Sequence, residues 1–166
     1  MKTLVIHPKD TSTDFLKAIY ANKGWEVIDW NPSNSGLKKL IKEHDRIIML
    51  GHGCGDGLYG FDRFIVDSNL VYLLREKICI CIWCYAHQFV EKYGLNGFHT
   101  DMFISEYEEA ILECIDGTYD EITESNIKFA EIVNQYIDEP NSLELIKENY
   151  LPINDIVKYN RDRLYK

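Results

Sequence analysis

A histidine and a cysteine each follow a short, unbroken apolar segment of the chain. Residues 47–50 lead directly into Gly51 and His52, and residues 78–83 lead directly into Cys84. Unbroken apolar runs of this length are typical of strands that are buried on both faces, as in parallel sheets covered by helices. The carboxyl ends of such strands carry ligands and chemistry. Neighbouring strands would bring the imidazole and the thiol together, and this is the minimal pair for nucleophilic catalysis.

The two strand ends resemble those of the caspase–hemoglobinase group of cysteine peptidases, where one apolar strand ends in His-Gly and the next in the catalytic cysteine. The likeness covers residues 47–86. It implies that His52 is the general base, that Cys84 is the nucleophile, and that the backbone N–H groups of Gly53 and Cys84 form the oxyanion hole. The chain lacks the Gln-Ala-Cys block of caspases and the acidic residue that metacaspases have beside the cysteine, so no substrate preference carries over. The segment also resembles a family of small bacterial proteins, which implies no function.

The same strand ends define a wider crevice that could bind a ligand without any catalysis. Its candidate ligand-binding residues follow four predicted strands or open the helices after them: His7, Pro8, Lys9, Gly51, Cys54, Gly55, Asp56, Tyr85, Ala86, Ser105 and Glu106. A peptide or a small molecule, such as a nucleotide-derived signal, is the ligand expected here. A non-catalytic module that binds or sequesters such a ligand is therefore the alternative to a hydrolase.

Four glycines follow His52 closely and predict a flexible loop with close backbone approach to a ligand. Leu58 and Tyr59 are expected to pair with residues 64–66 in a small hairpin. Beyond the next strand, the helix that begins after Cys84 is expected to lower the thiol pKa and to favour the thiolate. Cys84 is then predicted to react with iodoacetamide faster than Cys79, Cys81 and Cys114, with Cys54 on the glycine loop as its competitor.

Other chemistry has weaker support in the sequence. Cys81 and Cys84 form a C-x-x-C pattern, but residues three apart on a strand face opposite sides, and no second C-x-x-C is present. We therefore predict no metal and no cofactor. His87 could orient the site or lie on an exposed helix face. Asp101, Glu106 and Glu108 would suit a basic substrate side chain, and a solvated helix cap explains Ser105 and its neighbours equally well.

Composition narrows the classes of partner. The chain has 166 residues, a formal net charge of -9 and 46% apolar residues. Nucleic acids and anionic membranes require clustered Lys and Arg, so neither is expected as a partner. An odd number of cysteines, several in one strand, favours a reducing compartment over a disulfide framework. With no signal-peptide pattern at the N-terminus, a cytoplasmic location is predicted.

The elements that must position the site alternate between strand and helix. The pattern predicts a single α/β domain over residues 1–166, a three-layer sandwich with a mostly parallel sheet of about five strands and helices on both faces. Residues 118–166 are expected to form a helical C-terminal tail packed on this domain. A third functional class, an inactive scaffold, would use Tyr150, Tyr159 and Tyr165 as an exposed aromatic patch, and self-association into a homo-oligomer stays open.

Overall fold

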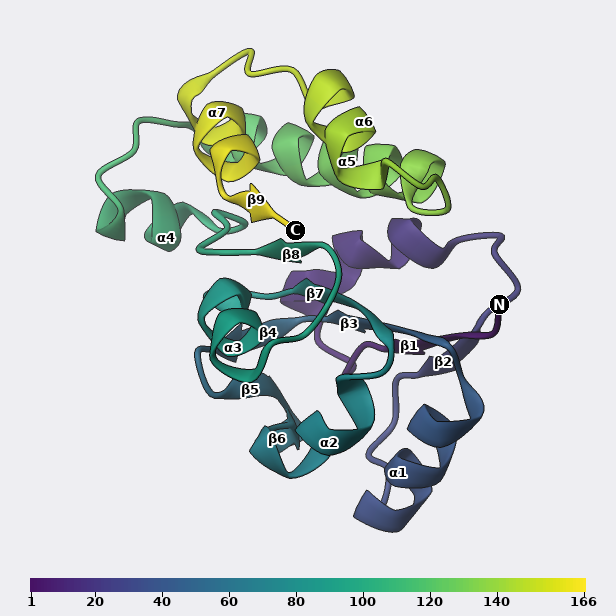
Figure 1. The fold of residues 1–166 in the computed structure, drawn as a ribbon. Coiled ribbons are helices and arrows are strands. Elements are labelled where there is room, and N and C mark those ends of the chain that lie inside the picture. The colour runs from purple at the N-terminus through teal and green to yellow at the C-terminus, as the bar shows by residue number, and fades with distance from the viewer.

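A six-stranded sheet forms the centre of the molecule in the computed structural model, which describes residues 1–166 (Figure 1). Its spatial order is β2 (Glu26–Ile28), β1 (Thr3–Ile6), β3 (Arg46–Leu50), β7 (Ile78–Ile82), β8 (His99–Thr100) and β9 (Leu164–Tyr165). The first five strands are parallel, and β9 is antiparallel to β8. The predicted α/β class and mostly parallel sheet are confirmed. The sixth strand has only two residues, too few to give a periodic signal.

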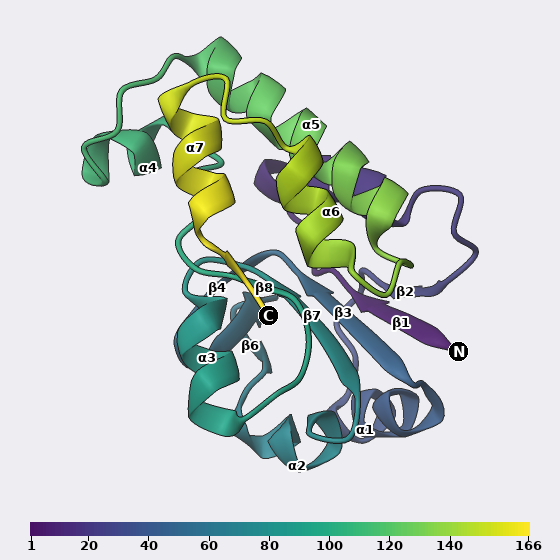
Figure 2. The same cartoon turned by 45° about the horizontal axis from the view of Figure 1, so that its top comes forward.

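Helices cover both faces of the sheet, which makes the predicted three layers (Figures 1 and 2). One face carries α1 (Asn34–Glu43), α2 (Val71–Leu74) and α3 (Ala86–Tyr93), and the other carries η1 (Thr11–Tyr20), α5 (Tyr119–Tyr136) and α6 (Ser142–Asn149). The three-residue turn η2 (Ser68–Leu70) leads into α2. No helix combines the length and the apolar character that a membrane crossing requires.

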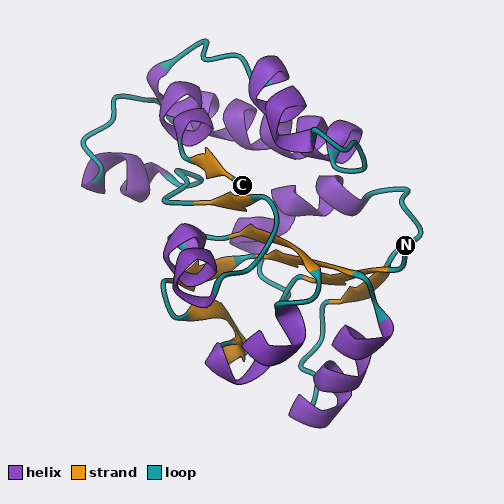
Figure 3. Ribbon diagram, viewed as in Figure 1, coloured by secondary structure: helices purple, strands orange, loops and turns teal.

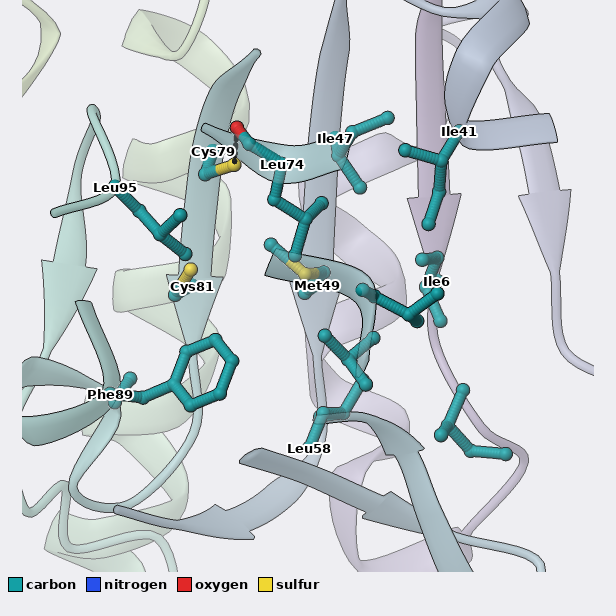
Figure 4. Packing of buried hydrophobic residues seen from close by; sticks show 14 of the residues in the cluster. Ile6, Ile41, Ile47, Met49, Leu58, Leu74, Cys79, Cys81, Phe89 and Leu95 are labelled. Carbon is teal, nitrogen blue, oxygen red and sulfur yellow. Dashed lines mark hydrogen bonds between the residues drawn. The ribbon is translucent and has the colours of Figure 1, made fainter. Parts of the chain in front are cut away.

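The strands divide their side chains between two cores, because successive residues of a strand point to opposite faces. Ile47 and Met49 belong to the cluster under α1, α2 and α3, whereas Ile48 and Leu50 belong to the cluster under η1 and α5. Figure 4 shows part of the first cluster, in which Cys79 and Cys81 lie among Leu74, Met49 and Phe89. These two buried cysteines are packing residues, as expected for sulfur within an apolar strand.

The segment after β3 forms a separate three-stranded antiparallel meander of β4 (His52–Cys54), β5 (Gly57–Gly60) and β6 (Arg63–Val66). The predicted hairpin is confirmed by the pairs Leu58↔Val66 and Tyr59↔Phe64. The predicted loop after His52 is wrong for Gly53 and Cys54, since these residues pair with β5 and form a strand. Figure 3, in the view of Figure 1, shows the meander beside α3.

The helical tail consists of α5, α6 and α7 (Asp155–Asp162), and α5 packs directly on η1. Asn134 of α5 stabilises this contact, because its Nδ2 donates to the carbonyls of Ala18 and Ile19 at 2.9 Å each. Tyr150 and Tyr159 are 1% and 8% exposed, so the predicted exposed aromatic patch is wrong. Both tyrosines pack against apolar side chains. The helical periodicity of the tail does not show whether a tyrosine packs in the core or faces solvent.

A short helix, α4 (Tyr107–Leu112), lies between β8 and the tail and packs against α7 through a small third cluster. The sequence from Phe98 to Ile104 predicts one continuous strand, but only His99 and Thr100 pair in the sheet. Residues 101–106 instead carry the chain across the carboxyl end of the sheet. This crossing brings the start of α4 to the strand ends where the histidine and cysteine emerge.

Candidate functional site

His52 and Cys84 follow adjacent parallel strands at equivalent positions. Leu50 pairs with Ile82 at the ends of β3 and β7, and the amide of Gly51 donates to the Ile82 carbonyl at 3.1 Å. The prediction that these strands are parallel neighbours is confirmed. His52 and Cys84 both line one small cavity of about 20 Å³ at this edge of the sheet. A cavity of this size holds about one water molecule. The side chains of Thr13, Phe103 and Ser105 contribute to the same wall.

The imidazole of His52 is held by the first turn of η1. Its Nε2 lies 2.6 Å from Oγ of Ser12, which in turn lies 2.7 Å from Oδ1 of Asp10. The second carboxylate oxygen of Asp10 is 3.9 Å from the same Nε2. Asp10 also caps η1, accepting the Ser12 amide at 2.9 Å. Hydrogen bonds from the Ser12 hydroxyl and amide lower the pKa of Asp10, so the carboxylate is ionised at neutral pH.

Neither Asp10 nor Ser12 was among the residues expected in the site. The sequence predicts a helix cap among residues 11–14, but the N-cap of η1 is Asp10, one residue before them, and Ser12 lies in the first turn. The available signal was topological, since these residues follow β1, a strand whose carboxyl end lies at the same sheet edge as those of β3 and β7.

The thiol of Cys84 is partly buried and faces oxygen atoms. Its Sγ lies 3.6 Å from the carbonyl oxygen of Phe103 and 3.7 Å from Oε1 of Glu109, so its single proton has two acceptors within reach. Burial and the nearby Glu109 carboxylate raise the pKa of Cys84 to about 12. The predicted lowering is therefore wrong in direction. A helix does begin just after Cys84, at Ala86, and its N-terminus would lower the thiol pKa. Burial of the thiol and the charge of the Glu109 carboxylate outweigh this effect.

Glu109 is held in place by the start of α4. Its Oε2 accepts the amides of Ser105 and Glu106 at 2.7 and 3.0 Å, which leaves Oε1 directed at Cys84. The helix cap expected at Ser105 lies one residue later, as a capping box with Glu106 at the N-cap and Glu109 at N3. Ser105 lines the cavity as expected, whereas Glu106 is exposed. The carboxylate that reaches the site thus belongs to Glu109, outside the acidic group that the sequence suggested.

The turn between β7 and α3 supplies unpaired backbone donors. The amides of Cys84 and Tyr85 donate to no backbone carbonyl, and Tyr85 has a left-handed conformation with φ 65°. Cys84 therefore keeps its candidate role as an oxyanion donor. Gly53 does not line the cavity. A Cβ on Gly53 would collide with the Trp83 ring, so its small size serves packing between the meander and the strand end.

A second, larger cavity of about 260 Å³ lies on another side of His52. Its walls come from the segment after β1 and from the tip of the β5–β6 hairpin: Pro8, Lys9, Asp10, His52, Tyr59, Gly60, Phe61 and Asp62. Phe61 and Asp62 both have positive φ, of 54° and 60°, which is unusual for side chains of this size. His52 is thus shared between a narrow cavity beside Cys84 and a broader one open to a ligand.

Several expected ligand-binding residues lie outside both cavities. His7 is 2% exposed and hydrogen-bonds Tyr20 and Thr13 within the core, and Ala86 is fully buried. The remaining candidates serve local packing or surface contacts: the Cys54 carbonyl accepts Trp83 Nε1 at 3.0 Å, Gly55 lies against Gln88, Asp56 pairs with Lys92 at 3.5 Å, and Tyr85 is 37% exposed. Pro8, Lys9 and Gly51 line the cavities as expected.

His87 does not orient the site. Its Nδ1 lies 3.2 Å from Nε2 of His99, and its ring stacks on Tyr165 with centroids 4.5 Å apart. This stack connects α3 to the C-terminal strand. Cys81 is fully buried in the core, so it does not join Cys84 in a surface C-x-x-C site. No group of three or more His, Cys, Asp or Glu side chains is arranged to hold a metal ion.

No family model matches this chain, and no curated protein is detectably similar to it. Among solved structures the chain is similar to one described as a flavodoxin from the domain Archaea. The TM-score is 0.41 and the identity 15%, over 80% of this chain and 99% of that chain. A likeness at this level carries no information on the function of the His52–Cys84 edge. The resemblance of the two strand ends to cysteine peptidases stays a prediction.

Proposed function

We propose that the protein is a Cys/His-dependent hydrolase that transfers an acyl group to Cys84 and then to water. The observation that carries the proposal is the single cavity lined by both His52 and Cys84 at the ends of adjacent parallel strands. A nucleophile and a base at one strand edge, with the base held by a third group, is the arrangement required for nucleophilic catalysis. The form that the resemblance implies is a caspase-like endopeptidase.

The raised pKa of Cys84 determines how the first step proceeds. The thiol is neutral in the resting protein, so His52 takes its proton while sulfur attacks the substrate carbonyl carbon. The carbonyl π electrons move to oxygen, and the Cys84 amide is the candidate donor to that oxyanion. The tetrahedral intermediate then expels an amine or alkoxide, which receives the proton from His52. Water, deprotonated by His52, hydrolyses the thioester and regenerates the thiol.

The two cavities divide the substrate between them. The narrow cavity accommodates the reacting carbonyl in place of one water, and the broader cavity accommodates the group attached to it. Aromatic side chains of Tyr59 and Phe61 and the carboxylates of Asp10 and Asp62 line the broader cavity beside a single lysine, Lys9. A cavity of this volume accommodates one side chain of amino-acid size next to the reacting carbonyl.

A non-catalytic ligand-binding module is the second candidate, and one observation favours it. The Cys84 thiol has acceptors on Phe103 and Glu109 within reach, and its raised pKa describes a satisfied, protonated thiol. Such a thiol could simply form part of a binding wall. The crevice would then retain a small molecule, such as a nucleotide-derived signal, between the segment after β1 and the hairpin tip.

Cys84→Ala separates the two candidates, with Cys114→Ala as the matched control because Cys114 is exposed and lies outside the cavities. Each protein is incubated with peptide and acyl-ester libraries and with a cell metabolite extract, then heated to release bound compounds. Cleavage by wild type and Cys114→Ala, absent in Cys84→Ala, supports the hydrolase. An intact compound retained by all three proteins, with no cleavage, contradicts the hydrolase and supports the binding module.

A further inference from the structure

We propose that Asp10 and Ser12 are positioning residues that hold His52 in the tautomer with its proton on Nε2, leaving Nδ1 as the basic nitrogen. Ser12 is the relay between the carboxylate and the ring. The catalytic consequence of this relay rests on the proposed hydrolase function. The relay itself depends only on the hydrogen bonds among the three side chains, and a measurement on the ring tests it directly.

The number of protons available fixes the direction of these hydrogen bonds. Ser12 Oγ lies 2.7 Å from Asp10 Oδ1 and 2.6 Å from His52 Nε2. A hydroxyl has one proton, and an ionised carboxylate has none. The proton between Ser12 and Asp10 must therefore come from Ser12. The Ser12 oxygen is then an acceptor toward His52, so the proton between them must come from Nε2.

The reverse arrangement leaves two oxygens in contact without a proton. If Ser12 donated to Nε2, its oxygen would face a negatively charged oxygen of Asp10 at 2.7 Å. Bonds from hydroxyls to carboxylates are among the short and strong ones, whereas two facing acceptors repel. The Ser12 amide donates to the same Oδ1 at 2.9 Å, so two donors from one residue converge on this carboxylate oxygen.

The second carboxylate oxygen of Asp10 lies on the same side of the ring. Its Oδ2 is 3.9 Å from Nε2, the nitrogen that Ser12 contacts. Both side chains therefore face Nε2 and leave Nδ1 free of this contact. A histidine oriented by a third group is the general requirement of such pairs.

Asp10 and Ser12 lie at the start of η1, a helix that is packed into the core. Asp10 is the N-cap of η1, and the buried residues Leu16 and Ile19 of that helix belong to the core cluster under α5. The contact with Asn134 holds the other end of η1. Packing of η1 therefore determines the position of the Ser12 hydroxyl against the first residue of β4, although the two residues are 40 positions apart in the sequence.

The test is the protonation state of the His52 ring nitrogens, read from ¹⁵N chemical shifts and two-bond N–H couplings in protein labelled with ¹⁵N-histidine. Wild type is compared with Ser12→Ala, with the hydroxyl-retaining Ser12→Thr, and with Ser33→Ala as a matched control. Ser33 is likewise a serine at the start of a helix, where its hydroxyl accepts the Gly36 amide, but it hydrogen-bonds no histidine. His52→Gln assigns the signal.

We expect the Nε2–H tautomer in wild type, Ser12→Thr and Ser33→Ala, and a mixture of both tautomers in Ser12→Ala. A wild-type ring with its proton on Nδ1 overturns the relay. So does a tautomer that stays the same in a folded Ser12→Ala protein, with folding checked by the amide spectrum.

Measurements of turnover distinguish a failure of this inference from a failure of the proposed function. On a substrate cleaved by wild type, Ser12→Ala should lower kcat by about 10- to 100-fold with little change in KM, a part of what a positioned base contributes, and Ser12→Thr should restore most of it. Complete loss in Ser12→Ala, with fluorophosphonate labelling of Ser12 in wild type, would make Ser12 the nucleophile and overturn the relay. Absence of any turnover, together with a tautomer that responds to Ser12→Ala, removes the hydrolase and supports the relay.

Discussion

The Sγ atom of Cys84 lies 3.7 Å from the carboxylate oxygen Oε1 of Glu109, which is anchored by the first turn of α4. A thiol beside a carboxylate is harder to ionise, because the thiolate would face a like charge. Glu109 and burial together keep the sulfur protonated at neutral pH. The residue that restrains the thiol thus comes from a different element than the residue proposed to deprotonate it.

Glu109→Gln should lower the pKa of Cys84 and speed its alkylation by iodoacetamide at pH 8. We expect a three- to tenfold increase, approximately the change in thiolate fraction for a shift of up to one pKa unit. Burial, the larger cause of the raised pKa, remains in the variant. Mass spectrometry of the modified peptides measures the rate at Cys84, and the exposed Cys114 is the internal reference. An unchanged rate at Cys84 would show that Glu109 does not restrain the thiol.

His7 should make stability depend on pH between about 4 and 6.5. Burial is the main cause that lowers its pKa from 6.5 to about 4, so the neutral ring is favoured in the folded protein. Below pH 6.5 the unfolded chain takes up a proton that the folded chain does not, and folding stability falls by up to about 3 kcal/mol as pH approaches 4.

Urea unfolding of wild type and His7→Gln at pH 7.5, 5.5 and 4.5 measures this term. The variant should be less stable at pH 7.5, because Tyr20 and Thr13 lose a partner, and should lose less stability on acidification. His99, whose pKa is also lowered by burial, remains in both proteins and contributes equally. Parallel curves for the two proteins would contradict the assignment of this pH dependence to His7.

Gly53→Ala should destabilise the protein by about 1–3 kcal/mol, the usual cost of forcing extra volume into a packed site. The new Cβ would collide with the Trp83 ring and the Gly57 carbonyl. Denaturant unfolding measures the change. Gly36→Ala is the control, since its Cβ meets only Ser33 Oγ and alanine is the better helix former. Equal stability of the two variants would show that the meander adjusts freely around Trp83.

Tyr85→Gly should relieve the left-handed backbone after Cys84 and stabilise the protein by up to about 1 kcal/mol. Tyr85→Val should destabilise it, because a β-branched side chain tolerates positive φ poorly. Thermal unfolding of both variants against wild type gives the two signs. A loss of stability in Tyr85→Gly would mean that contacts of the tyrosine ring outweigh the backbone strain.

The sequence predicted the two strands that carry the site, because an unbroken apolar run indicates a strand that is buried on both faces. Residues 47–50 and 78–82 have no polar position on either face, which two covering helical layers require, and their order along the chain made them neighbours. The positions of His52 and Cys84 at neighbouring strand ends follow from these two strands alone. Cys79 and Cys81 within β7 were correctly predicted to pack in the core, and Cys84, two residues beyond the strand end, lines the cavity.

The partners of these two residues were not predictable in the same way. Ser12 and Glu109 each belong to a local capping pattern that is complete without any distant contact. Whether a capped helix begins beside a strand end or away from it depends on the path of residues 7–10 and 101–106, which have no periodicity. The thiol pKa was mispredicted for the same reason, since the facing carboxylate comes from 25 residues further along the chain.

Both edges of the main sheet are very short. The edge strand β2 has three residues and β9 has two, while the four inner strands lie between them. A long, flat edge with free N–H and C=O groups is a template on which another chain can add a strand. Neither edge here offers enough consecutive groups for that purpose. Self-association of this protein by extension of the main sheet is therefore disfavoured.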